Sequence, residues 1–103
     1  MEHFLSQISL KMDKLFSENE LKIRYWTITT LQDVRRIEKK INLVSEHPEI
    51  RFTLEFLYED LLTYISELTR ICKDRVEETF TRLISFGIIK VTTQSALRLS
   101  DLA

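Results

Sequence analysis

Turn-forming residues are scarce in this chain of 103 residues, which contains one glycine and one proline. An all-β domain of this length needs a turn about every 8–12 residues, and such turns rely on glycine, proline and asparagine. We therefore expect a mainly α-helical fold with few connections. Apolar residues make up 44% of the chain and the formal net charge is only −1, so it reads as globular rather than disordered.

The sequence contains no recognisable catalytic or cofactor motif. Its single cysteine, Cys72, cannot form an internal disulfide, and no cysteine–histidine cluster has the spacing of a zinc site. His3 and His47 lie far apart, and there is no glycine-rich phosphate loop. No segment approaches the roughly 20 apolar residues of a membrane span. We expect a non-enzymatic protein without a cofactor or a membrane partner, in a reducing compartment such as the cytoplasm.

Two amphipathic helices are predicted before residue 48. The second opens with Ser17-Glu18-Asn19-Glu20, a capping box, and should run to about Ser45. We interpret 1–47 as a helical extension and expect two copies to form a homodimer through 1–46, because one small domain cannot cover both stripes. The first stripe consists of Phe4, Leu5, Ile8, Met12, Leu15 and Phe16, and the second of Leu31, Val34, Ile37, Ile41 and Val44.

Parts of this region have two interpretations. Residues 23–30 are rich in β-branched and aromatic side chains, which also suit a strand, although the flanking helical period favours a helix. A basic cluster follows, and it is either a solvated helix face or a phosphate contact. The cluster consists of Arg35, Arg36, Lys39 and Lys40.

Pro48 divides the chain, because it disfavours helical backbone at His47 and should end the long helix. Residues 50–57 alternate like a short strand but also suit a helix. From 58 to 68 the helical period is clear. The inner side of that helix is formed by Leu61, Leu62, Ile65 and Leu68.

The last third of the chain has the most specific pattern. Ser66 is a small residue where the helix over 58–68 must let a neighbour approach, and Ile71 is an apolar residue in the connection that follows. Cys72 then opens another helix, where a small residue is favoured. A narrow apolar stripe with spacings of four and three predicts the buried side of this helix: Val76, Phe80 and Leu83.

A hairpin is predicted after this helix. Gly87 lies just past the last helical residue, where a left-handed cap favours glycine. Residues 88–92 are short and β-branched, 93–95 suit a turn, and 96–99 alternate between apolar and polar. This is the pattern of two antiparallel strands joined by a short loop.

The order of these segments resembles the winged helix-turn-helix superfamily, and within it the DNA-binding part of cyclic-AMP-receptor-type and MarR-type regulators. We therefore interpret 48–103 as a winged helix-turn-helix domain. The resemblance implies a protein that binds double-stranded DNA with the exposed face of its second helix. It is carried by Ile65-Ser66-Glu67-Leu68, Ile71, Val76, Phe80, Leu83 and Gly87-Ile88-Ile89.

The same resemblance supplies a set of candidate DNA-binding residues. Those in the second helix are expected at its start or on its outward side, and the last two on the wing strands. Glu77 and Glu78 depart from the pattern, because carboxylates repel phosphate, although a carboxylate can accept a hydrogen bond from cytosine. Residues 69–98 still carry a net charge of +3. The candidates are Lys73, Arg75, Thr79, Arg82, Lys90 and Arg98.

Two functions follow from the sequence. The first is a small transcription regulator that binds duplex DNA as a homodimer. The second is a non-enzymatic interaction or assembly module built on a winged helix, which the acidic residues Glu77 and Glu78 and the nearly neutral net charge favour.

Overall fold

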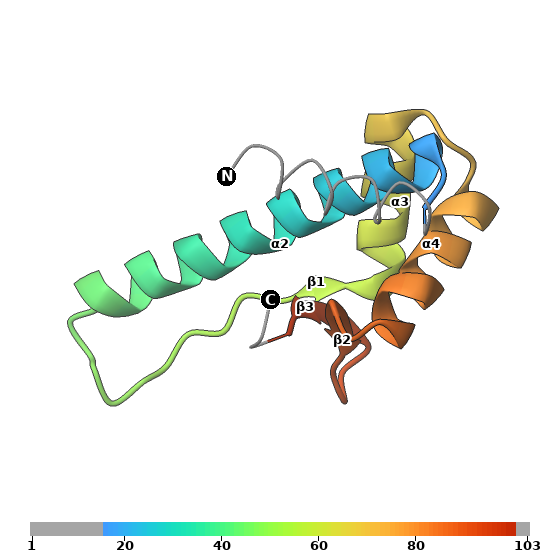
Figure 1. Ribbon diagram of the computed structural model, residues 1–103. Coiled ribbons are helices and arrows are strands. Elements are labelled where there is room, and N and C mark those ends of the chain that lie inside the picture. Colours follow the sequence, from blue (N-terminus) through green and yellow to red (C-terminus); the bar gives the residue numbers. More distant parts are fainter. Residues whose placement is uncertain (1–15, 101–103) are drawn as a thin grey trace, which may run out of the picture.

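The computed structural model describes residues 16–100, which are mainly α-helical as expected. In this part of the chain three helices precede a C-terminal hairpin, and the hairpin belongs to a three-stranded antiparallel sheet (Figure 1). The first predicted stripe lies outside the described residues, apart from Phe16. The elements are α2 (Glu18–Val44), β1 (Phe56–Leu57), α3 (Tyr58–Thr69), α4 (Lys73–Ser85), β2 (Ile89–Val91) and β3 (Ala96–Leu99).

The predicted capping box begins α2. The Ser17 amide donates to Glu20 Oε1 at 3.2 Å, and the Glu20 amide donates to Ser17 Oγ at 3.3 Å. The helix continues without a break through 23–30, so the helical interpretation of that stretch is confirmed. Spacing explains why the helix forms despite its β-branched residues, because Ile23, Thr27 and Leu31 recur every fourth residue and are all buried.

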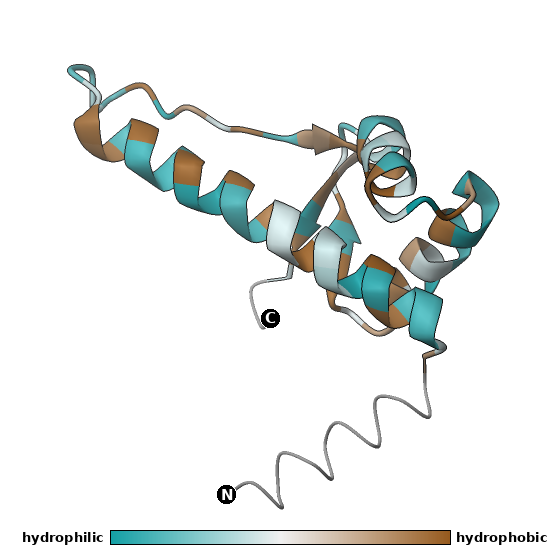
Figure 2. Ribbon diagram, turned by 90° about the horizontal axis from the view of Figure 1, so that it is seen from above, coloured by the Kyte–Doolittle hydropathy of each residue, from teal (hydrophilic) through white to brown (hydrophobic). Residues whose placement is uncertain are grey.

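The second half of α2 projects from the rest of the molecule, and the chain returns beside it (Figures 1 and 2). The Asn42 side chain donates to the Phe52 carbonyl at 2.9 Å and accepts from the Phe52 amide at 2.8 Å. Glu38 Oε2 accepts from the Leu54 amide at 2.9 Å. We call residues 33–55 the arm. Its returning part has no regular structure before β1. Residues 50–57, which suited a strand or a helix, therefore form a strand only over Phe56–Leu57.

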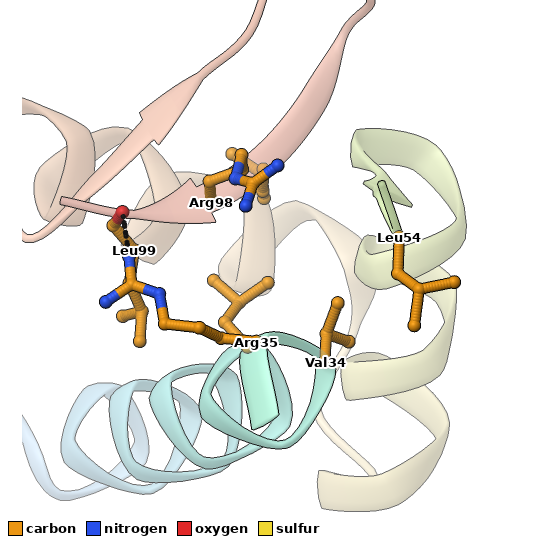
Figure 3. A pocket seen from close by; sticks show the side chains of 7 residues that line it. Val34, Arg35, Leu54, Arg98 and Leu99 are labelled. Atoms are coloured by element: carbon orange, nitrogen blue, oxygen red, sulfur yellow. Dashed lines mark hydrogen bonds between the residues drawn. The ribbon is translucent and has the colours of Figure 1, made fainter. Parts of the chain in front are cut away.

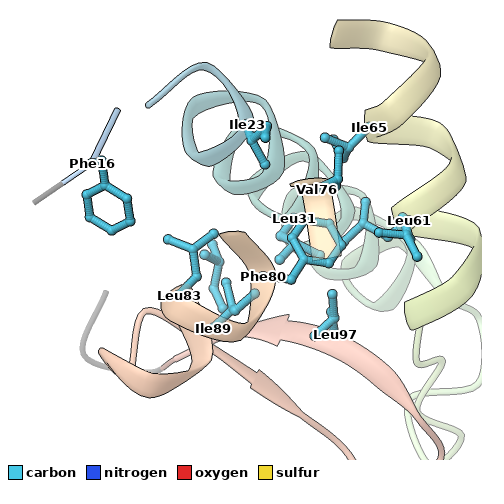
Figure 4. Close-up of a cluster of buried hydrophobic side chains, with 12 residues drawn as sticks. Phe16, Ile23, Leu31, Leu61, Ile65, Val76, Phe80, Leu83, Ile89 and Leu97 are labelled. Carbon is cyan, nitrogen blue, oxygen red and sulfur yellow. The ribbon is translucent and has the colours of Figure 1, made fainter. Parts of the chain in front are cut away.

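One hydrophobic core joins all three described helices to the sheet (Figure 4). The predicted stripe of α4 is confirmed, since Val76, Phe80 and Leu83 are fully buried. The first half of α2 contributes to this same core, so over 16–31 the expected helical extension is packed into the domain. The core residues are Phe16, Ile23, Leu31, Leu61, Leu62, Ile65, Val76, Phe80, Leu83, Ile89, Leu97 and Leu99.

The sheet has the order β1-β3-β2, and both of its pairings are antiparallel. β1 precedes α3 in the sequence and pairs with β3 from the C-terminal hairpin, with Phe56 opposite Leu97. The hairpin β2–β3, which we call the wing, turns over Thr92–Ser95, where the Ser95 amide donates to the Thr92 carbonyl at 3.1 Å. This arrangement is compatible with a winged-helix-like topology.

Candidate nucleic-acid interface

The turn between α3 and α4 sets the position of α4. Arg70 has a left-handed backbone with φ of 59°, which ends α3. Ser66 Oγ donates to the Ile71 carbonyl at 2.6 Å, so the small residue predicted at this position also bonds the connection. Cys72 then caps α4 with its backbone carbonyl, which accepts from the Val76 amide at 3.1 Å. α4 is therefore anchored at its start by backbone geometry and one hydroxyl group.

A glycine ends α4, as the sequence predicts. Gly87 has φ of +74°, in the left-handed region that glycine adopts without strain. The Gly87 amide donates to the Ile84 carbonyl and the Ile88 amide to the Leu83 carbonyl, both at 3.0 Å. These two bonds form a Schellman motif, which satisfies carbonyls at the end of the helix. The motif turns the chain directly into β2, so α4 and the wing are held together.

The outward face of α4 carries mixed charge. Lys73 and Arg75 are exposed in its first turn, as predicted. Asp74 and Glu78 are also exposed, and their spacing of four places both carboxylates on one line along the helix. Glu77 is exposed as well. Burial raises the pKa of Tyr58, and the nearby negative charges of Glu77 and Glu59 raise that pKa further. The exposed side of the helix is thus not a continuous basic surface.

The prediction that Thr79 lies on the outward side of α4 is wrong. Its side chain is 1% exposed, and its hydroxyl donates to the Arg75 carbonyl at 3.0 Å within the helix. Thr79 lies three residues after Val76 and next to Phe80, so the helical period places it on the edge of the buried stripe. The stripe of α4 is wider than its three large apolar residues indicate.

Arg82 is held against the protein. Its Nη1 donates to Glu20 Oε2 at 2.5 Å, across 62 residues of sequence. The guanidinium also lies 4.7 Å from the centre of the Phe16 ring and 5.9 Å from that of Phe86, which are cation–π distances. Burial would raise the pKa of Glu20, but the bonds from the Ser17 amide and from Arg82 outweigh it and lower that pKa. Arg82 therefore stabilises the junction of α2 and α4.

The two candidates on the wing lie directly opposite each other. Lys90 pairs with Arg98 in the β2–β3 register, so both side chains leave the same face of the sheet. Like charges in this position repel each other. Arg98 Nη2 donates to Glu38 Oε1 at 3.2 Å, which offsets that repulsion and joins the wing to α2. The buried residues Ile89, Leu97 and Leu99 alternate with these two and face the core.

A basic groove that the resemblance did not indicate lies between the arm and β3. Four basic residues line it, with Glu38 as its single lining carboxylate among the described residues. The Arg35 side chain crosses from α2 to β3, where its Nη2 donates to the Leu99 carbonyl at 2.9 Å (Figure 3). The sequence indicated part of this group, since two of its members belong to the basic cluster of α2. The four basic residues are Arg35, Lys39, Arg51 and Arg98.

The six candidates therefore form separate groups. Lys73 and Arg75 share the exposed start of α4, Arg82 and Thr79 are engaged in the domain, and Lys90 and Arg98 share the outer face of the wing. Within residues 16–100, no cluster of histidine, cysteine or acidic side chains could hold a metal ion. No helix in that range has the length and hydropathy to cross a membrane.

Comparison with protein-family models, with curated proteins and with solved structures gives no match. Topology and side-chain geometry alone therefore carry the functional argument.

Proposed function

We propose that this chain is a DNA-binding transcription regulator of the winged-helix type that acts as a homodimer. The observation that carries the proposal is the exposed first turn of α4 with Lys73 and Arg75, on a helix whose other side is fully buried. A rigidly held helix with cations at its start is what insertion into a major groove requires. The order of helices and strands, with α4 followed by a wing, supports the same function.

The acidic residues of α4 refine the proposal. Phosphates lie on either side of a major groove, whereas base edges lie at its floor. Lys73 and Arg75 would contact phosphates, and Asp74 or Glu78 would accept a hydrogen bond from the amino group of cytosine. The phosphate contacts would supply the non-specific affinity, and the carboxylates would add discrimination between sequences.

The test is a fluorescence-polarisation titration of mixed-sequence duplex at about 50 mM salt. Lys73→Ala and Arg75→Ala should each weaken binding and lower the salt slope by about one unit, because each removes one phosphate contact. Lys22→Ala is the matched control, since Lys22 is an exposed lysine on α2, and it should bind like the unmodified chain. A dissociation constant weaker than about 10⁻⁴ M for the unmodified chain would exclude DNA as the partner.

A second function has its own support. Asp74, Glu77 and Glu78 are all exposed on α4, and three carboxylates on one helix suit a basic protein partner better than a phosphate backbone. Glu78→Gln separates the two functions. For a DNA-binding protein this change should strengthen non-specific duplex binding, because it removes a charge that repels phosphate. For an interaction module it should leave duplex binding undetectable and weaken the partner complex.

The homodimer is supported by the outer face of the arm. Ile37 is 51% exposed and Val44 is 74% exposed, although both belong to the predicted apolar stripe of α2. Asp33 and Arg36 form an ion pair beside Ile37, and Lys40 follows one turn later. If two copies of α2 pack antiparallel about Arg36 and Ile37, Asp33 of each copy lies opposite Lys40 of the partner subunit. The face is therefore complementary to itself in charge, with Ile37 between the charges.

Light scattering at micromolar concentration should give the mass of a dimer. In a Cys72→Ser background, Ile37→Cys should form an intermolecular disulfide under mild oxidation, because the proposed axis brings the two copies of residue 37 together. Thr81→Cys on the exposed face of α4 is the control and should not cross-link. A monomer mass without cross-linking would contradict the dimer and leave the DNA-binding proposal to its own test.

A further inference from the structure

We infer that the groove between the arm and β3 is a binding site for a small organic anion, a molecule with a carboxylate or phosphate head on an apolar body. The groove has a volume of about 770 Å³. That volume falls within the range of about 300–1,000 Å³ that is usual for small-molecule sites. No residue of α4 lines it, so this site is separate from the exposed first turn of α4 that carries the proposed DNA contacts.

The net positive charge of the groove favours an anionic ligand. Lys39 and Arg51 approach the groove from opposite walls, one from α2 and the other from the returning segment. Arg35 and Arg98 add two guanidinium groups on the side of β3. With Glu38 as the one carboxylate among the residues that line it, the groove carries a net formal charge of +3. A concave surface with this charge concentrates anions, because its low-dielectric walls focus the field.

The apolar residues that line the groove favour a ligand with an apolar body. Leu43, Pro48 and Ile50 line the same groove. Leu43 is 85% exposed and Ile50 is 52% exposed, so both have surface left to bury against a ligand. Cations and apolar side chains that line the same groove match a molecule with a charged head and an apolar body. An inorganic ion would contact only the cationic side chains of the groove and leave the apolar ones exposed.

The walls are already held in place. Asn42 makes two hydrogen bonds to Phe52, and Glu38 binds both the Leu54 amide and Arg98. Arg35 is fixed to the Leu99 carbonyl (Figure 3). The site is therefore largely formed before a ligand binds, and only the flexible side chains of Lys39 and Arg51 have to become ordered. Such preorganisation favours binding, because less entropy is lost.

The experiment is a calorimetric titration of the full chain with three probes. Phenyl phosphate carries both features, inorganic phosphate carries the head alone, and benzyl alcohol carries the body alone. Phenyl phosphate should bind with a dissociation constant of about 1 mM or tighter, at least about tenfold tighter than inorganic phosphate. Benzyl alcohol should show no saturable binding in the same range. Affinities for inorganic and phenyl phosphate that are equal would overturn the assignment to an organic anion.

Variants locate the site. Lys39→Gln and Arg51→Gln should each weaken phenyl phosphate binding about fivefold or more, because each removes one positive charge from the wall. Lys22→Gln is the matched control, since Lys22 is an exposed lysine of the same helix that lies outside the groove, and the affinity of this variant should be unchanged. Equal binding to the unmodified chain and to the Lys39→Gln/Arg51→Gln double variant would overturn the inference.

A duplex titration identifies the other source of phosphate. The double variant should bind duplex DNA as the unmodified chain does, because neither Lys39 nor Arg51 belongs to α4 or to the wing. If instead it loses duplex binding while phenyl phosphate fails to bind the unmodified chain, the groove belongs to a nucleic-acid surface and the inference is wrong. Failure of duplex binding in both proteins would count against the proposed function and leave the anion titration unaffected.

Discussion

The two halves of α2 have the same apolar spacing and very different surroundings. Ile23 and Leu31 in the first half are buried against α3, α4 and the sheet, whereas Ile37 and Val44 in the second half are mostly exposed. Figure 2 shows apolar positions continuing along the projecting end of the helix. Periodicity therefore establishes which side of a helix is apolar. What covers that side depends on elements that are distant in the sequence.

The two halves are also held in different ways. The first half is stabilised by apolar burial in the common core. The arm depends on a few polar bonds, chiefly those of Asn42 with Phe52 and of Glu38 with Leu54. Each such hydrogen bond near solvent contributes little to the free energy of unfolding. We therefore expect the arm to open locally at lower free energy than the domain unfolds.

The largest expected effect concerns the core. Phe80→Ala should reduce the free energy of unfolding by about 3–5 kcal/mol, because it removes a fully buried ring. Leu43→Ala on the arm should change it by less than about 0.5 kcal/mol, since most of that side chain is exposed. Urea unfolding followed by circular dichroism measures both. An unchanged free energy of unfolding for Phe80→Ala would mean that the α4 register is wrong.

A smaller effect concerns the ion pair at the start of α2. Glu20→Gln should cost about 1 kcal/mol at neutral pH, because it weakens the capping box and the bond to Arg82. The folded pKa of Glu20 is lowered from 4.5, so its contribution is present above that value. The contribution is lost as the pH falls through the folded pKa.

Unfolding curves at neutral pH and at about pH 3 test this sign. The difference between the unmodified chain and Glu20→Gln should shrink toward acid, because the glutamate then becomes neutral as well. Asn19→Ala, at an exposed position in the same turn, is the control and should show no such pH dependence. A difference that grows toward acid would contradict the assigned direction.

The smallest effect on the free energy of global unfolding concerns the arm, where the change should stay local. Asn42→Ala removes both bonds to Phe52, so amide exchange at residue 52 should become faster, by about tenfold for a loss of roughly 1.4 kcal/mol. Exchange at core amides of α4 should not change. Asn42→Asp keeps the acceptor for the Phe52 amide and should retain part of the protection. Equal acceleration in the core would show that the arm and the domain unfold together.

Local signals predicted much of this fold. The capping box at Ser17, the stripe of α4 and the glycine cap at Gly87 each depend on residues within a few positions of one another. The ion pairs of Arg82 and Arg98 could not be predicted from local signals, because their partners Glu20 and Glu38 lie 62 and 60 residues away in the sequence. Thr79 was misplaced for a local reason, since a threonine can be buried when its hydroxyl bonds within its own helix.

Glu38 connects the returning segment of the arm to the wing through two hydrogen bonds. One carboxylate oxygen holds the Leu54 amide of the returning segment and the other holds Arg98 on β3. β3 is the central strand of the sheet, paired with β1 on one side and β2 on the other. A displacement of the returning segment away from α2 would therefore break a hydrogen bond to the same carboxylate that holds Arg98, so the positions of the arm and of the wing depend on one side chain.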